Sequence, residues 1–243
     1  MVQVKKAAPT SAMVLAAGLG RRMRPLTATR PKPLVEVAGR SLLDRALDTL
    51  KAGGVTDVVV NVHYMADSVE AHLAARPSGL NVQISDERAL LLETGGGLTK
   101  ALPLIKTDPF LSINADNIWI DGPVGGARLL AERWDDEAMD ALLLLIPLAR
   151  ANCHGGPGDF HMDPLGRLSR RRPPRVAPFV YTGLQMLSKR LFEGVEATPF
   201  SMNSLWDKAA AEGRLYGVTH QGLWFDVGTA AAVKQTEALL DRF

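Results

Sequence analysis

Positive charge is concentrated in one short segment near the beginning of the sequence, "LAAGLGRRMRPLTATRPKPL" (residues 15–34). An apolar run ends there in two glycines, which are followed by four arginines and a lysine: Arg21, Arg22, Arg24, Arg30 and Lys32. Glycine lets backbone N–H groups turn inward and bind an anion, and arginine adds charge-assisted hydrogen bonds to phosphate oxygens. Because the whole chain has a net charge of only +2, this segment predicts a compact, strongly anionic ligand.

The spacing within this segment separates it from two common phosphate-binding motifs. It is not a P-loop, because Lys32 is far from Gly18 and Gly20 and no Lys-Ser or Lys-Thr pair follows the glycines. It is not a dinucleotide fingerprint either, because the third glycine is missing. Taken alone, the glycines are more typical of a simple turn. Pro31 and Pro33, however, restrict where the Lys32 ammonium group can reach.

Two aspartates follow apolar stretches later in the chain. Asp116 ends "FLSINAD", and Asp226 lies in "LWFDVGT". Either aspartate alone is more typical of a turn cap. Magnesium prefers hard oxygen ligands and usually takes one or two carboxylates together with phosphates and water. As a pair in a chain that binds a polyphosphate, the two aspartates predict a Mg²⁺ site.

The alternation of apolar and amphipathic segments predicts the elements that position these residues. Strands are expected at 12–17, 57–64, 80–85, 110–116 and 138–147, and in the less regular second half at 158–162, 175–187, 215–220 and 223–227. Helices are expected at 41–54, 66–75, 95–105, 124–134, 201–213 and 229–242. This order predicts a Rossmann-like α/β fold, with a mostly parallel mixed sheet and helices on both faces. In such sheets ligands bind beyond the carboxyl ends of the strands, where the glycine turn and Asp116 both fall.

The composition predicts a globular domain and excludes several classes of protein. The chain has 243 residues, 47% hydrophobic and 22% charged, which suffices for one full core. Its single cysteine excludes a disulfide framework and fits a cytoplasmic protein. The longest apolar run, "ALLLLIPLA", is too short to cross a membrane, and basic residues without interleaved aromatics argue against nucleic acid. We expect a flexible leader at 1–11 and one domain at 12–243.

Four motifs together resemble those of the sugar-1-phosphate nucleotidyltransferases. The 15–34 segment resembles the family signature L-A-A-G-x-G-[T/S]-R-L-x-P-L-T-x-x-x-P-K-P, and "LLETGGGLTKAL", "INAD" and "WFDVGT" follow in the family order. Within the family, "LETGGG", "GDF" and "GLWFDVGT" are most similar to the short N-acetylmuramate-1-phosphate uridylyltransferases. The resemblance implies a single GT-A-like nucleotidyltransferase domain without a left-handed β-helix.

The resemblance also implies a set of site residues. Arg22 and Lys32 would be the catalytic cations, and Asp116 and Asp226 would bind Mg²⁺. The nucleotide would contact Leu15, Ala16, Ala17, Gly18, Gly20, Arg21, Gln83 and Ser85. The sugar phosphate would contact Glu93, Thr94, Gly95, Asn114, Asp159, Tyr181 and Thr182.

The implied reaction joins a nucleoside triphosphate (NTP) to a sugar 1-phosphate and releases pyrophosphate. The expected pair is UTP with N-acetylmuramate 1-phosphate, as in peptidoglycan recycling. The alternatives are GTP with mannose 1-phosphate, and another sugar or choline phosphate. A silent regulatory subunit is the non-enzymatic alternative, but such a copy would be expected to lose Lys32, Asp116 or Asp226. No nucleic-acid or membrane partner is expected, and the chain would act as a monomer or small homo-oligomer.

Three features depart from the family pattern. Arg21 stands where the family usually has threonine or serine, and Ala115 replaces the usual glycine before Asp116. The basic run "RLSRRRPPR" (167–175) has no counterpart in the subgroup, and such a run is usually a solvated loop. It could also contact an acidic group on the sugar phosphate.

Overall fold

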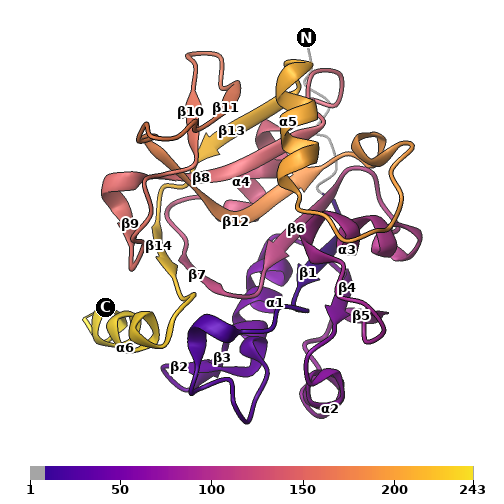
Figure 1. Cartoon of the computed structure of the whole chain (residues 1–243), viewed down its shortest axis with the longest axis vertical. Coiled ribbons are helices and arrows are strands. Elements are labelled where there is room, and N and C mark those ends of the chain that lie inside the picture. Colours follow the sequence, from indigo (N-terminus) through magenta and orange to yellow (C-terminus); the bar gives the residue numbers. More distant parts are fainter. Residues whose placement is uncertain (1–8, 243) are drawn as a thin grey trace.

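The structure is a computed structural model that describes residues 9–242. Most of the expected leader, residues 1–8, lies outside the described residues. The helices are α1 (Leu42–Ala52), α2 (Ala66–Ala75), α3 (Glu93–Ala101), α4 (Gly126–Arg133), α5 (Asn203–Ala211) and α6 (Ala230–Leu240). The strands of the main sheet are β1 (Ser11–Leu15), β4 (Asp57–Val62), β5 (Asn81–Asp86), β6 (Phe110–Asn114), β8 (Ala141–Pro147), β10 (Phe160–Met162), β11 (Leu168–Arg170), β12 (Phe179–Leu187) and β13 (Leu215–Thr219). Figure 1 shows these elements in chain order.

The main sheet is mixed, with a parallel half and a largely antiparallel half, as Figure 1 shows. Its strand order is β11-β10-β12-β6-β1-β4-β5, and β8 and β13 extend it from β12. Strands β6, β1, β4 and β5 are parallel to one another. Strand β12 is antiparallel to all three of its partner strands, β6, β8 and β10. The fold is therefore the expected single α/β domain, and its centre is the parallel part.

Helices cover both faces of the sheet because successive side chains of a strand point to opposite faces. Ala12 and Val14 of β1 pack with the buried sides of α1, α2 and α4 in one core. Met13, which lies between them, belongs to a second core with residues of α3 and α5. The Ser41 side chain caps α1 by accepting the Asp44 N–H at 3.0 Å, which confirms the helix start expected from the sequence.

A small separate sheet carries one of the candidate metal ligands. Strand β14 (Leu223–Asp226) pairs antiparallel with β7 (Asn117–Ile120) and parallel with β9 (Ala151–Asn152). A third apolar cluster joins this sheet to the 15–34 segment and α6 through Met23, Phe225 and Val233. Strand β7 was not expected from the sequence, because four residues paired only with a distant strand give a weak local pattern.

Two boundaries differ from the expected ones in ways that affect the site. The first strand ends at Leu15 rather than residue 17, so Ala16 and Ala17 belong to the turn that follows it. The basic run 167–175 is not entirely a loop, because Leu168–Arg170 form β11 at the edge of the sheet. No helix among residues 9–242 is both long enough and apolar enough to cross a membrane.

Candidate active site

The site lies where the chain changes direction in the parallel half of the sheet. From β1 the chain passes to β4 and β5 on one side, and then returns through α3 to β6 on the other side. A crevice forms beyond the carboxyl ends of the strands at such a point. The turn after β1, Asn61 near the end of β4 and Asn114 at the end of β6 meet there.

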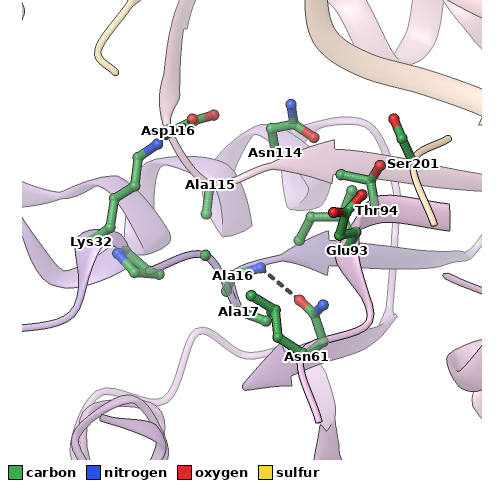
Figure 2. A pocket seen from close by; sticks show the side chains of 14 residues that line it. Ala16, Ala17, Lys32, Asn61, Glu93, Thr94, Asn114, Ala115, Asp116 and Ser201 are labelled. Carbon is green, nitrogen blue, oxygen red and sulfur yellow. Dashed lines mark hydrogen bonds and ion pairs between the residues drawn. The ribbon is translucent and has the colours of Figure 1, made fainter. Parts of the chain in front are cut away.

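A cavity of about 380 Å³ occupies this crevice. Apolar residues and glycine form most of its walls, and a few polar side chains project into it. The lining residues are Leu15, Ala16, Ala17, Gly18, Lys32, Pro33, Asn61, Leu91, Glu93, Thr94, Asn114, Ala115, Asp116 and Ser201. Figure 2 shows Lys32 and Asp116 at one end and Glu93, Thr94 and Ser201 at the other. The cavity thus has the Lys32–Asp116 ion pair at its charged end and a carboxylate with two hydroxyls at the other end, and the turn after β1 joins the two.

The glycine turn after β1 has a conformation that requires glycine at one position. Gly20 has φ +63°, and a Cβ there would lie 2.9 Å from the Thr27 side chain and 3.1 Å from Cβ of Lys32. The Thr27 hydroxyl donates to the Gly20 carbonyl at 2.8 Å, which fixes the turn from the other side. Gly20 therefore brings the Lys32 segment close to the turn, and Gly18 lines the cavity itself.

Lys32 reaches across the cavity to the end of β6. It begins a short 3-10 helix, Lys32–Leu34, and both neighbouring prolines are buried. Its Nζ lies 2.5 Å from Oδ2 of Asp116, and the two side chains are 15% and 25% exposed. Asn117 donates to the other Asp116 oxygen at 3.0 Å. The lysine and the carboxylate are therefore held together at the charged end of the cavity.

Asp226, the last residue of β14, has partners of its own. His154 Nδ1 lies 3.1 Å from Asp226 Oδ2, and the Gly228 N–H donates to Oδ1 at 3.1 Å. A Cβ on Gly228 would lie 3.3 Å from the Arg22 guanidinium, so Arg22 also approaches this carboxylate. Burial raises the pKa of Asp226, but His154, the Gly228 amide and the Arg22 charge outweigh burial and lower it below its ordinary value.

A smaller cavity of about 150 Å³ brings the two aspartates together. It shares Asn114 and Asp116 with the main cavity and adds His154, Asp159, Tyr181, Trp224 and Asp226, among others. A third cavity of about 290 Å³ shares Asp159 and Tyr181 with it and adds Arg170, Arg171, Asn203 and Trp206. The three cavities form a row that leads from the glycine turn past both aspartates to the basic run.

The donor set of the aspartate cavity is compatible with Mg²⁺. Three carboxylates line it, those of Asp116, Asp159 and Asp226, but no three His, Cys, Asp or Glu side chains in residues 9–242 are close enough together to form a metal site by themselves. A cation held by Asp116 and Asp226 would need phosphate oxygens and water for its remaining ligands. Magnesium in nucleotide enzymes is usually bound in this way.

Tyr181 and Asp159 form a wall between the aspartates and the third cavity. Oδ2 of Asp159 accepts the Tyr181 N–H at 2.9 Å, which orients the carboxylate. The Tyr181 hydroxyl is buried and has no hydrogen-bond partner within the described residues. Burial, assisted by the charge of Asp116, raises the pKa of Tyr181 well above its usual range. The hydroxyl is therefore an uncharged group that can still donate a hydrogen bond.

The glycine triplet of "LETGGG" allows the 198–201 segment to lie directly on α3. A Cβ on Gly95 would come within 2.2 Å of the Phe200 ring, and one on Gly96 within 2.0 Å of the Thr198 carbonyl. The Gly95 N–H donates to the Phe200 carbonyl at 2.9 Å, and the Thr94 hydroxyl accepts the Met202 N–H at 2.9 Å. These contacts hold the segment so that Ser201 lines the main cavity.

Several candidate residues from the sequence do not line these cavities. Gln83 is exposed on β5, the edge strand of the sheet, and Ser85 is buried on the same strand. Thr182 is fully buried, and its hydroxyl donates to the Leu144 carbonyl at 2.9 Å inside the sheet. Gly95 acts through close packing, and Arg21 is exposed beside Arg22. Resemblance placed these residues along the chain, but strand orientation and neighbouring elements decide which side chains reach the cavities.

The structure also adds residues that sequence reasoning missed. Asn61, Ser201 and His154 line the cavities, and buried Glu87 bonds to Asn61. A polar Asn61 within the β-branched run "DVVVNV" was the one available signal, because a buried amide needs hydrogen-bond partners. Ser201 and His154 lie in irregular segments whose approach to the site depends on the tertiary fold.

The basic run contributes two arginines to the row of cavities. Arg170 forms a two-point ion pair with Asp207, with N···O distances of 2.6 and 2.8 Å. The Arg171 guanidinium donates to the Gly158 carbonyl at 2.9 Å and the Arg175 carbonyl at 3.3 Å. Arg170 is thus neutralised by a carboxylate, whereas the hydrogen-bond partners of the Arg171 side chain within the described residues are uncharged carbonyls.

Comparison with known proteins agrees with this geometry. The MobA-like NTP transferase domain family matches residues 12–150. The chain is 45% identical to an N-acetylmuramate alpha-1-phosphate uridylyltransferase of Caulobacter vibrioides, over 96% of this chain and 98% of that protein. It is 35% identical to the protein of that name from Neisseria meningitidis serogroup B, over 94% and 97% of the two chains.

Solved structures share the fold at lower identity. The inositol-1-phosphate CTP transferase from T. maritima superposes with a TM-score of 0.78 at 18% identity, over 97% of this chain and 96% of that chain. The turn after β1, the Lys32–Asp116 pair and the second aspartate therefore lie on a nucleotidyltransferase scaffold of GT-A-like fold. The chain belongs to the MobA-like NTP transferase family and is a sugar-phosphate nucleotidyltransferase.

Proposed function

We propose that this enzyme transfers UMP from UTP to N-acetylmuramate 1-phosphate, forming UDP-N-acetylmuramate and pyrophosphate. The observation that carries the proposal is the 45% identity, over nearly the full length of both chains, to a protein named for this reaction. The row of three cavities supports it, because a nucleotide, a reacting phosphate and a sugar need adjoining spaces. We assign the reaction to peptidoglycan recycling in the cytoplasm.

The main cavity is the proposed nucleotide site. The nucleoside would lie along the turn after β1, where backbone groups of Ala16 to Gly18 are available to the base and ribose. Glu93, Thr94 and Ser201 close the far end. The triphosphate would run toward Lys32 and Asp116, with Arg22 and the turn amides beside its β- and γ-phosphates.

The sugar 1-phosphate would enter from the aspartate cavity. Asp159, Tyr181 and Asn114 face this space, and they offer carboxylate, hydroxyl and amide groups to sugar hydroxyls. The buried Tyr181 hydroxyl is free to donate a hydrogen bond to this substrate. In this proposal the sugar phosphate would lie on the opposite side of Asp116 from the nucleoside.

The reaction needs electrostatic help rather than a general base. The second pKa of a phosphate monoester is about 6, so the attacking phosphate oxygen is already ionised at neutral pH. That oxygen bonds to the α-phosphorus of UTP as the bond to pyrophosphate breaks. Lys32 and Arg22 stabilise the negative charge that develops during this transfer. Mg²⁺, held by Asp116 and Asp226, would add further neutralisation at the α-phosphate.

A substrate grid tests the proposal. Pyrophosphate release is measured for each of the four NTPs with N-acetylmuramate, N-acetylglucosamine, glucose and mannose 1-phosphates. The expected result is the highest kcat/KM for UTP with N-acetylmuramate 1-phosphate. A higher value for GTP with mannose 1-phosphate would replace the proposed substrates while leaving the nucleotidyltransferase assignment intact. Gel filtration with light scattering tests whether the enzyme is the expected monomer or small homo-oligomer.

A further inference from the structure

A buried carboxylate lies behind the main cavity and is not used in the mechanism above. Glu87 follows β5 and is 1% exposed. Its Oε1 accepts a hydrogen bond from Nδ2 of Asn61 at 2.7 Å, and its Oε2 accepts the Leu92 N–H at 3.0 Å. A Cβ on Gly97 would come within 2.8 Å of Oε1, so the third glycine of the triplet makes room for this carboxylate.

Asn61 extends this chain of hydrogen bonds to the turn after β1. Its Oδ1 accepts the Ala16 N–H at 2.7 Å, the contact drawn as a dashed line in Figure 2. Asn61 is 2% exposed, so water cannot readily substitute for either partner. The chain runs from Ala16 through Asn61 and Glu87 to Leu92, and both of its ends are backbone N–H donors.

Two terminal donors determine what the side chains between them must supply. Positions 61 and 87 contribute two polar side-chain atoms each. Together these four atoms must provide three acceptors and one donor, which one carboxylate and one amide supply. With Glu87 as the carboxylate, the Asn61 amide has a single permitted orientation. Its NH₂ group faces Glu87, and its oxygen faces Ala16. A flipped amide would place its NH₂ group against the Ala16 N–H.

The two ends of the chain belong to different walls of the main cavity. Ala16 lies in the turn that follows β1, and Leu92 caps α3, whose first residues Glu93 and Thr94 line the cavity. We propose that Glu87 is a positioning residue for the nucleotide: it fixes the Asn61 amide and thereby holds the Ala16 turn at a set distance from the start of α3. This inference rests on the proposed function, in which the main cavity binds the NTP.

Substitutions that keep the shape of the side chains separate this role from simple burial. In Glu87→Gln, two amides must bridge two N–H donors, so every orientation leaves one donor facing another. In Asn61→Asp combined with Glu87→Gln, the carboxylate moves to position 61 and all three hydrogen bonds can form again. The double variant has the same net charge and almost the same volume as the wild type. It should therefore restore what the Glu87 variant loses.

The test measures binding of Mg²⁺-UTP by calorimetry, together with steady-state kinetics and thermal melting. We expect Glu87→Gln to raise the dissociation constant and KM for UTP about tenfold or more, with kcat and the KM for the sugar phosphate changed less than about threefold. The double variant should return KM to within about threefold of wild type. Asp86→Asn is the matched control. It alters the neighbouring exposed carboxylate, which pairs with Arg88, and should leave the KM for UTP unchanged.

Two outcomes would overturn the inference. One is an unchanged KM for UTP in Glu87→Gln, and the other is a correctly folded double variant that keeps a raised KM. If Glu87→Gln does not fold, the double variant alone decides the test. A folded double variant with a KM for UTP near that of the wild type supports the inference, and a folded one with a raised KM overturns it. A wild-type enzyme that binds another NTP in preference to UTP contradicts the proposed substrate but not this inference, and the same series is then measured with that nucleotide.

Discussion

Lys32 and Asp116 are 84 positions apart in the sequence, yet Nζ of the lysine and Oδ2 of the aspartate are separated by 2.5 Å. The pair joins the proline-flanked segment after β1 to the turn after β6, and it lies where the main cavity meets the aspartate cavity. A cation and an anion in contact there suit the proposed site, in which Lys32 would bind a phosphate and Asp116 would bind Mg²⁺. When substrate binds, Lys32 would exchange its contact with Asp116 for one with a phosphate oxygen, which would leave the Asp116 carboxylate available to hold Mg²⁺.

Replacing Lys32 by alanine should lower kcat more than it raises the KM for UTP. In the proposed mechanism the lysine lies where negative charge develops in the transition state, so its loss is expected to reduce kcat about a hundredfold, or about 3 kcal/mol. Steady-state kinetics with UTP as the varied substrate provide the measurement. An effect confined to KM would assign Lys32 to ground-state binding.

Replacing Asp226 by asparagine should abolish turnover without unfolding the protein. An amide is a weaker ligand for Mg²⁺ than a carboxylate, and we expect kcat/KM to fall about a hundredfold or more. The measurement is activity across a Mg²⁺ titration, with circular dichroism as the control for folding. Activity near that of the wild type at low Mg²⁺ would remove Asp226 from the metal site.

His154 should act on Mg²⁺ through Asp226. Its Nδ1 is 3.1 Å from Asp226 Oδ2, and its ring lies beside Trp224 with centroids 6.1 Å apart. His154→Phe keeps a ring but removes this contact, so the Mg²⁺ concentration for half-maximal activity should rise about tenfold. The KM for UTP, measured at saturating Mg²⁺, should change little. An unchanged Mg²⁺ dependence would limit His154 to packing.

Gly96→Ala should destabilise the fold. The added Cβ would meet the Thr198 carbonyl at 2.0 Å, and backbone cannot move aside as easily as a side chain. The free energy of unfolding should fall by about 1–3 kcal/mol, measured by denaturant titration. Gly155→Ala is the matched control, because a Cβ at Gly155 meets nothing within 4 Å. Equal stability of the two variants would show that the 198–201 segment adjusts to the methyl group.

The basic run should contribute to the choice of sugar. N-acetylmuramate 1-phosphate carries a lactyl carboxylate, and arginine can bind a carboxylate through two hydrogen bonds. Changing Arg170, Arg171 and Arg172 together to glutamine should raise the KM for this substrate about tenfold and leave that for N-acetylglucosamine 1-phosphate unchanged. Because Asp207 already pairs with Arg170, we expect Arg171→Gln to account for most of the effect. Equal changes in the KM for both sugar phosphates would indicate that the basic run is a solvated surface with no part in the choice of sugar.

The sequence was sufficient for the parallel half of the fold, where strong local patterns agree with tertiary structure. The first strand, the capped helix after Ser41 and the glycine turn were all found close to their positions in the structure. It was not sufficient for β7, which depends on pairing with a strand more than a hundred residues away. Local patterns therefore located β14, the strand that carries Asp226, but not β7, the strand with which it pairs.

The residues of the site also fall into two groups, those that the sequence reveals and those that only the folded structure reveals. Lys32, Asp116 and the glycine turn are recognisable because they lie in segments that resemble the motifs of the family. Gln83 and Thr182 show the limit of such reasoning, because one is exposed on an edge strand and the other is buried inside the sheet. Asn61 and Glu87 could not be predicted as site residues, because their role depends on hydrogen-bond donors and acceptors that only the folded chain brings together.

Strand β12 runs antiparallel to β6, and this junction divides the row of cavities between two parts of the sheet. The proposed nucleotide walls belong to β1, β4, β6 and α3, whereas Asp159, Tyr181 and the basic run belong to β12 and the segments around β10 and β11. Substitutions in the second group can therefore accumulate without disturbing the first. An enzyme built in this way can acquire a new acceptor sugar during evolution while it keeps its nucleotide donor.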